Sequence, residues 1–192
     1  MSSLLESTAN TRQVLPGSMR FLRSDAPLAP TERDVAFLLG HGVTTLIDLR
    51  SEAEVLRKPC PLAAHPGFSY QNLPVTGGNA MPESPADVPR SYLRMLDAQM
   101  ARILRTIGSA GSGVMFFCAA GKDRTGVVSA LLQRQAGMQR EAIIADYLLS
   151  GENLREPLRA FASLHPEIDP VIITPCTAYM EAFLDGLEEP DK

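Results

Sequence analysis

Residues 113–126 have the sequence Gly113-Val114-Met115-Phe116-Phe117-Cys118-Ala119-Ala120-Gly121-Lys122-Asp123-Arg124-Thr125-Gly126. The apolar run at 113–117, framed by glycines, is typical of a central β-strand. From Thr125 onward the apolar positions 127, 128, 130, 131 and 132 predict a mostly buried helix that ends at Gly137. The sequence therefore predicts a loop, residues 118–124, that joins the end of a buried strand to the start of a helix.

Further strands and helices are predicted on both sides of this segment. Two stretches, 43–49 and 68–73, predict strands, and 77–89 is rich in Gly and Pro and predicts a loop. Thr31 and Asp34 form a capping-box pattern that predicts a helix start. Further helices are predicted by one long apolar stripe (Leu93, Leu96, Met100, Ile103, Leu104, Ile107), by a second (Ile143, Ile144, Tyr147, Leu148), and by a last one (Met180, Phe183, Leu184, Leu187) that Thr174 and Pro175 would cap. We therefore expect an α/β fold in which helices flank a central, mostly parallel sheet.

The bulk composition is that of an ordinary globular chain. With 192 residues, 45% hydrophobic and 21% charged, the sequence predicts one domain over residues 1–192, with flexible ends at 1–17 and 189–192. The net charge of −4 argues against a nucleic-acid partner, which would need a basic face. No apolar run approaches the roughly 20 residues that span a bilayer, so we expect no integral membrane segment.

The cysteines and the start of the chain bear on location. Cys60, Cys118 and Cys176 are an odd number at wide spacing, which fits neither a disulfide framework nor a zinc site and favours a reducing compartment. Residues 1–10 lack the basic and apolar regions of a signal peptide. We therefore expect a cytoplasmic protein, with export by a route without a cleaved signal left open. Cys60 and Cys176 are expected to be structural or incidental.

The loop 118–124 has the features of an anion site. Successive backbone N–H groups can curl around one centre, and the start of the following helix adds its positive dipole end. Gly121 permits a backbone conformation that other residues resist. Arg124 offers a planar fork that matches two phosphate oxygens, and Lys122 adds a second positive charge near the rim. These features predict a phosphate site built from Ala119, Ala120, Gly121, Lys122, Asp123 and Arg124. Arg50, at the end of a predicted strand, either contacts the substrate or forms a structural ion pair.

Cys118 is expected at the floor of this site. A helix start and neighbouring cations favour the thiolate, which is the nucleophilic form of cysteine. The thiolate would attack phosphorus to give a phosphocysteine that water then hydrolyses, while Arg124 stabilises the equatorial oxygens. We expect the Thr125 hydroxyl to hydrogen-bond the sulfur and help it leave. This chemistry needs no metal or other cofactor.

The string Cys-x5-Arg-Thr-Gly at 118–126 resembles the signature of the protein tyrosine phosphatase superfamily, which includes dual-specificity and phosphoinositide phosphatases. The fuller string is similar to a bacterial atypical branch with both phosphotyrosine and lipid phosphatase members. The resemblance extends over about Ser18 to Leu158, through Arg23-Ser24, 45–51 with Glu54, and 146–154. It implies a cysteine-phosphatase-like fold and hydrolysis of phosphomonoesters on proteins or phosphoinositides.

Two features of the resemblance leave questions open. The family usually has His immediately before the nucleophile, where this chain has Phe117. The general acid that protonates the leaving group is also open. Asp123 is favoured because some relatives, such as the myotubularin lipid phosphatases, are thought to use an Asp at this position. Asp87 is the alternative acid, although it would also serve as a helix N-cap.

Two other functions fit parts of the loop. A rhodanese-like sulfur transferase also places a cysteine after a strand, but the Thr125-Gly126 continuation fits it poorly. A catalytically silent phosphate-binding module would keep Arg124 and the backbone nest, and Phe117 favours this alternative. The sequence therefore predicts a phosphatase first, with a phosphate-binding module as the non-enzyme alternative.

Overall fold

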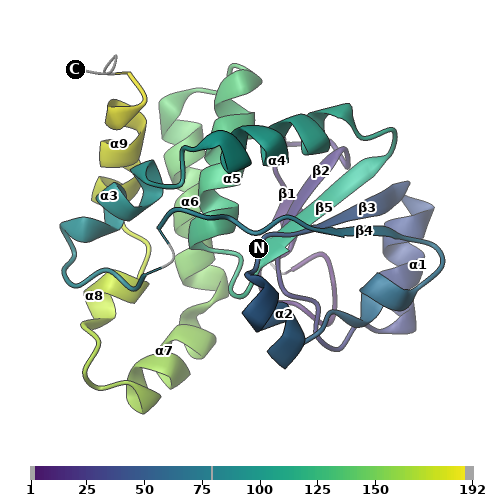
Figure 1. Ribbon diagram of the computed structural model, residues 1–192, viewed down its shortest axis with the longest axis horizontal. Helices are drawn as coiled ribbons and strands as arrows, with labels where there is room; N and C mark the ends of the chain where they lie inside the picture. Colours follow the sequence, from purple (N-terminus) through teal and green to yellow (C-terminus); the bar gives the residue numbers. More distant parts are fainter. Residues whose placement is uncertain (1–2, 79, 189–192) are drawn as a thin grey trace.

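A five-stranded sheet lies at the centre of the computed structural model, which describes residues 3–78 and 80–188 (Figure 1). Its strands are β1 (Arg12–Gln13), β2 (Phe21–Asp25), β3 (Val43–Asp48), β4 (Ser69–Asn72) and β5 (Gly113–Cys118). They follow the order β1-β2-β5-β3-β4, and only the β1–β2 pair is antiparallel. The prediction of a central, mostly parallel sheet is confirmed, although β1 and β2 were not predicted.

Helices cover both faces of the sheet. They are α1 (Glu32–Gly40), α2 (Glu52–Arg57), the 3-10 turn η1 (Pro61–Ala64), α3 (Asp87–Leu93), α4 (Ala98–Ser109), α5 (Asp123–Gln135), α6 (Arg140–Asn153), α7 (Arg155–Leu164), α8 (Pro170–Ile173) and α9 (Thr177–Gly186). In Figure 1, α4, α5, α6 and α9 gather on one side of the sheet and α1 lies on the other. None of the described helices is long and apolar enough to cross a membrane.

The central strand β5 shows how the two layers arise. Val114, Phe116 and Cys118 face the helical layer that contains α4 and α5, while Met115 and Phe117 face the layer that contains α1. Side chains alternate along a strand, and a parallel strand covered on both faces is apolar throughout. Phe117 is therefore a core residue on the face opposite to Cys118.

Two predicted helix boundaries are wrong. The long helix predicted from Leu93 is two helices, because the Asp97 carboxylate accepts a hydrogen bond from the Met100 amide at 2.8 Å and caps a new helix, α4. The last helix starts after Thr174, with Cys176 at its N-cap. The predicted capping box at Thr31, by contrast, is present at the start of α1.

The amino-terminal segment is packed onto the protein, contrary to the predicted flexible end at 1–17. Leu5 and Asn10 are buried, and the Asp25 carboxylate accepts hydrogen bonds from the amides of Ala9 (3.0 Å) and Asn10 (2.8 Å). Hydrogen bonds to polar groups distant in the sequence fix this segment, and such contacts leave no apolar periodicity from which its order could be predicted. The predicted flexible end at 189–192 lies outside the described residues, as do residues 1–2.

Candidate active site

The loop 118–124 begins at the last residue of β5 and includes the first two residues of α5. Gly121 has a φ of +66°, and a Cβ at this position would lie 2.5 Å from backbone atoms of Ser24 and Asp25. A side chain would therefore both strain the backbone and collide with the end of β2. Position 121 therefore requires glycine, as expected from the sequence, and the loop packs directly against the end of β2.

Hydrogen bonds from behind hold the carbonyl groups of the loop. The Gly121 carbonyl accepts from Asn10 Nδ2 at 2.9 Å and from Arg23 Nη2 at 3.0 Å, and the Ala119 carbonyl accepts from the Ala26 amide at 3.2 Å. The C=O and N–H of a trans peptide unit point in opposite directions. Fixing the carbonyls at the back therefore turns N–H groups toward the start of α5, as an anion nest requires.

A buried ion-pair cluster lies behind the loop. Asp146 on α6 binds Arg12 Nε and Arg23 Nη1, each at 2.6 Å. Burial would raise the pKa of Asp146, but the charges of the two arginines outweigh it and hold that pKa below its usual range. Burial, with the charge of Arg23, lowers the pKa of Arg12 to about 10. The cluster ties α6, β1 and β2 to the back of the loop.

Arg124 makes a two-pronged ion pair with Glu54 on α2. Its Nη1 and Nη2 donate to the two carboxylate oxygens at 2.7 and 2.8 Å. Ser51 orients Glu54 in turn, because its amide donates to Glu54 Oε2 at 2.9 Å in a capping box. The bond from Arg124 is the main reason that the pKa of Glu54 falls to about 2. Glu54 is a site residue that the sequence offered only through the resemblance, although the Ser-x-x-Glu pattern could have marked it.

Asp123, on the other side of Arg124, meets a hydroxyl group and an ammonium group. The Tyr92 hydroxyl donates to Asp123 Oδ1 at 2.5 Å, and Lys122 Nζ lies 3.3 Å from Oδ2. Lys122 also donates to the Ile173 carbonyl at 2.6 Å, and only 5% of its surface is exposed. Lys122, expected to add a positive charge near the rim, lines the cavity, but its ammonium is buried and already bound on two sides.

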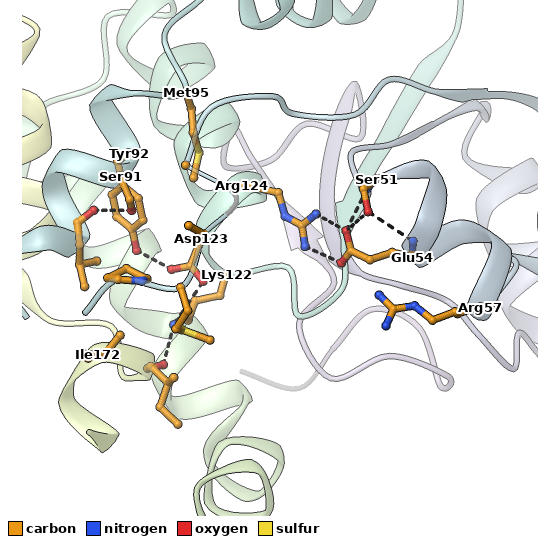
Figure 2. A pocket seen from close by; sticks show the side chains of 16 residues that line it. Ser51, Glu54, Arg57, Ser91, Tyr92, Met95, Lys122, Asp123, Arg124 and Ile172 are labelled. Atoms are coloured by element: carbon orange, nitrogen blue, oxygen red, sulfur yellow. Dashed lines mark hydrogen bonds and ion pairs between the residues drawn. The ribbon is translucent and has the colours of Figure 1, made fainter. Parts of the chain in front are cut away.

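A cavity of about 490 Å³ opens over these groups (Figure 2). Figure 2 shows Arg124 between Glu54 on one side and Asp123 on the other. One wall is polar and comes from α2. The other is largely apolar and comes from the loop before α3, from α3, from the turn after α3 and from α8. The apolar wall includes Met81, Pro82, Val88, Met95, Ile172 and Ile173. The cavity can therefore hold a charged group and an apolar group side by side.

Arg57 is a further cation on the polar wall. It lines the cavity and is exposed. Its Nε donates to the Ala53 carbonyl of its own helix at 3.2 Å, and no carboxylate of the described residues pairs with it. Arg57 was not among the predicted site residues, since one arginine on a short helix carries no pattern.

Cys118 and Thr125 lie on either side of residues 119–124, are buried, and are not among the residues that line the cavity. Cys118 ends β5, is 3% exposed, and lies close enough to Arg124 to interact with its charge. Burial would lower the pKa of Arg124, but Glu54 and Cys118 outweigh it and raise that pKa above its usual value. The buried Thr125 Oγ1 has no hydrogen-bond partner among the described residues, so the expected bond to the Cys118 sulfur is absent.

Two predicted candidates lie elsewhere. Arg50 is 2% exposed, pairs with Asp48 at 2.5 Å, and is not among the residues that line the cavity. It forms the structural ion pair that the sequence left open, and its predicted contact with substrate is not supported. Asp87 begins α3, accepts from the Ser84 hydroxyl at 2.6 Å and pairs with Arg90, also outside the cavity lining.

The sequence of the chain is similar to those of known tyrosine phosphatases. A model described as the tyrosine phosphatase family matches residues 6–190. A tyrosine-protein phosphatase of Nostoc commune is 31% identical over 134 residues, which is 65% of this chain and 46% of that protein. A putative tyrosine-protein phosphatase of Cupriavidus necator is 28% identical over 199 residues, covering 93% of this chain and 70% of that protein. The triple specificity protein phosphatase PtpB of Mycobacterium tuberculosis is 40% identical over 75 residues, covering 36% and 27%. The match with the Nostoc protein thus spans about half of that relative's length.

Proposed function

Because the chain belongs to the tyrosine phosphatase family, we propose that it hydrolyses phosphomonoesters through a phosphocysteine at Cys118. One observation carries this proposal. The loop 118–124 has its carbonyls bound from behind at Ala119 and Gly121, ends in the oriented guanidinium of Arg124, and begins with Cys118. The positive end of α5 points at the same place and favours both a bound dianion and a thiolate.

Arg124 is suited to hold the phosphoryl group in place. A guanidinium has five N–H donors, and Glu54 takes one from each terminal nitrogen. The remaining donors can bind two phosphate oxygens without breaking the ion pair. In the transition state these donors and the loop amides would stabilise the equatorial oxygens as charge spreads over them.

The reaction then runs in two balanced steps. The Cys118 sulfur forms a bond to phosphorus while the ester P–O bond breaks, and Asp123 gives its proton to the leaving oxygen. A water molecule next attacks phosphorus, the S–P bond breaks, and Asp123 takes the proton of the water. Asp123 is preferred to Asp87 because it lines the cavity and Asp87 does not.

Phosphotyrosine is the substrate class that the cavity favours. Its ring would pack on the apolar wall formed by Met81, Met95 and Ile172 while its phosphate enters the loop. A polyphosphorylated inositol would need several further free cations. Among the described residues that line the cavity, Arg57 alone could meet this need, because Arg124 is paired with Glu54 and the Lys122 ammonium is bound by Ile173 and Asp123. We therefore place phosphotyrosine peptides first, and phosphoserine peptides and phosphoinositides second.

Two broader expectations remain part of the proposal. We propose that residues 1–192 form one catalytic domain and that the protein works in the cytoplasm. Cys60, Cys118 and Cys176 are free thiols, which agrees with a reducing compartment.

Release of phosphate, compared between the wild type and Cys118→Ser, tests the proposed function. The substrates are p-nitrophenyl phosphate, a phosphotyrosine peptide, a phosphoserine peptide and phosphoinositides. We expect turnover of the first two that Cys118→Ser abolishes while leaving thermal unfolding unchanged. If the wild type binds phosphotyrosine peptides but turns over none of these substrates, the chain is a phosphate-binding module.

A further inference from the structure

Three side chains from distant parts of the sequence form one hydrogen-bond chain that ends in the cavity. Tyr147 on α6 lies with its Oη 2.8 Å from Tyr92 Oη on α3, and Tyr92 donates to Asp123 Oδ1 on α5 at 2.5 Å. Both tyrosines are 1% exposed. Figure 2 shows the Tyr92 hydroxyl directed at the Asp123 carboxylate. This contact is a part of the site that the loop sequence does not encode.

The direction of the chain is determined by its hydrogens. A phenol has one O–H, so the hydrogen of Tyr92 is used on Asp123 and the Tyr147–Tyr92 bond must use the hydrogen of Tyr147. In the reverse direction Asp123 would donate to Tyr92, and Tyr92 to Tyr147. The hydrogen of Tyr147 would then lack an acceptor, because the Tyr147 hydroxyl has no second hydrogen-bond partner among the described residues. A buried donor without a partner is costly, so the chain runs from Tyr147 to Asp123.

The environment keeps both hydroxyls neutral. Burial, followed by the charge of Asp123, raises the pKa of Tyr92 well above 10, and burial does the same for Tyr147. The Tyr92 ring is fixed by edge-on contacts with Tyr147 and Phe183, each with centroids 6.2 Å apart. The donor aimed at Asp123 therefore has one position and stays protonated over the working pH range.

We propose that Tyr92, supported by Tyr147, is the positioning residue that prepares Asp123 to act as the general acid. With Oδ1 occupied by the Tyr92 hydrogen, the transferable proton is confined to Oδ2. The ion pair between the Lys122 ammonium and Oδ2 belongs to the ionised form of Asp123. The ammonium cannot accept the proton of the acid form, and its charge stabilises the carboxylate left after transfer. This inference rests on the proposed function, in which Asp123 protonates the leaving oxygen.

Leaving-group dependence tests the proposal. Tyr92→Phe removes the donor and keeps the ring contacts. We expect kcat/KM to fall about tenfold, the effect of one hydrogen bond to a charged group, for phenyl phosphate, whose leaving oxygen needs a proton. For p-nitrophenyl phosphate, with a good leaving group, the loss should be small. Tyr147→Phe should cost about two- to threefold, as expected for a bond between neutral groups.

Tyr179→Phe is the matched control. This tyrosine is also buried, but its hydroxyl donates to the Val171 carbonyl at 3.0 Å and does not touch the chain. It should leave both substrates and the pH profile of kcat unchanged. Thermal unfolding of all variants separates loss of fold from loss of function.

A double-mutant cycle gives the decisive result. If Tyr92 acts through Asp123, Tyr92→Phe should cost nothing further in an Asp123→Asn background, and both single variants should flatten the alkaline limb of the kcat profile. A loss of the same size in both backgrounds would overturn the positioning role and leave the phosphatase proposal standing. Turnover that survives Cys118→Ser would overturn the proposed function and this inference together. Should Tyr92→Phe not fold, Tyr147→Phe enters the same cycle.

Discussion

The site contains two carboxylates on opposite sides of Arg124, and their partners differ. Glu54 meets a guanidinium at 2.7 and 2.8 Å, while Asp123 meets the Tyr92 hydroxyl with one oxygen and lies 3.3 Å from an ammonium with the other. With a pKa of about 2, Glu54 carries no proton at neutral pH. The comparison teaches that the partner decides the role. A carboxylate that accepts two N–H groups of a guanidinium orients that cation. Asp123 has only single contacts, to a hydroxyl at Oδ1 and to an ammonium at Oδ2, and in the proposed mechanism it carries the proton at Oδ2.

Arg124→Lys removes the group that the two carboxylates flank, and should have the largest effect. Lysine keeps the charge but cannot bind Glu54 and phosphate together. We expect kcat/KM for p-nitrophenyl phosphate to fall about 10²- to 10³-fold, as when a transition-state donor is removed. Arg134→Lys at the other end of α5 is the control. A loss of less than about threefold would be incompatible with the proposed role of Arg124.

Exchanging each carboxylate for its amide tests the comparison directly. Asp123→Asn should lower kcat/KM for phenyl phosphate about 10²-fold and remove the alkaline limb of the kcat profile, because the acid is lost. Glu54→Gln should cost about tenfold on every substrate and keep that limb, since it loosens Arg124 without touching the acid. Steady-state kinetics between pH 5 and 9 distinguish the two. If Glu54→Gln removes the limb and Asp123→Asn keeps it, our assignment of the two roles is reversed.

Acid should weaken the Glu54 side of the site first. The pKa of Glu54 is depressed from 4.5 to about 2 in the folded protein, so its ion pair contributes stability above pH 4.5 that is lost as the pH falls through about 2. The pair is partly exposed, so the contribution should be at most about 1 kcal/mol after screening. We expect the wild type to unfold at a higher temperature than Glu54→Gln at pH 6, and the difference to vanish near pH 2. A difference that persists at pH 2 would contradict the assigned ion pair.

The two sides also differ in how far the sequence predicts them. The loop 118–124 and its strand–loop–helix setting are local, so its glycine, its arginine and the burial of Cys118 follow from neighbouring residues. Tyr92 and Tyr147 come from other helices, and each looks like an ordinary core residue until the fold joins its hydroxyl to Asp123. Nothing within a few residues of a core tyrosine indicates its hydrogen-bond partner, so sequence reasoning missed the half of the site that helix packing assembles.

The same limit explains the errors in the predicted elements and sites. Arg50 stands where a substrate-binding arginine would, at the end of a strand, but the neighbouring Asp48 carboxylate holds it in the core. The apolar stripe from Leu93 to Ile107 keeps its period across a break that a single capping residue, Asp97, introduces. In both cases one aspartate changes the outcome that the surrounding sequence predicts: Asp48 binds the arginine in the core, and Asp97 starts a new helix.

Substitution of Arg57 tests whether the polar wall of the cavity binds a second anionic group of the substrate, and its expected effect is the smallest. It follows Glu54 by one helical turn on α2, but unlike Arg124 it has no carboxylate partner among the described residues, so it is available to a second anionic group on the substrate. We expect Arg57→Gln to lower kcat/KM about two- to fivefold for a phosphotyrosine peptide with glutamates beside the phosphotyrosine, as for an exposed ion pair. The effect should shrink in high salt and be absent for p-nitrophenyl phosphate. Arg102→Gln, on the exposed side of α4, is the matched control. An equal loss on both substrates would show that Arg57 does not bind the glutamates of the peptide. Arg57 would then help Glu54 to orient Arg124.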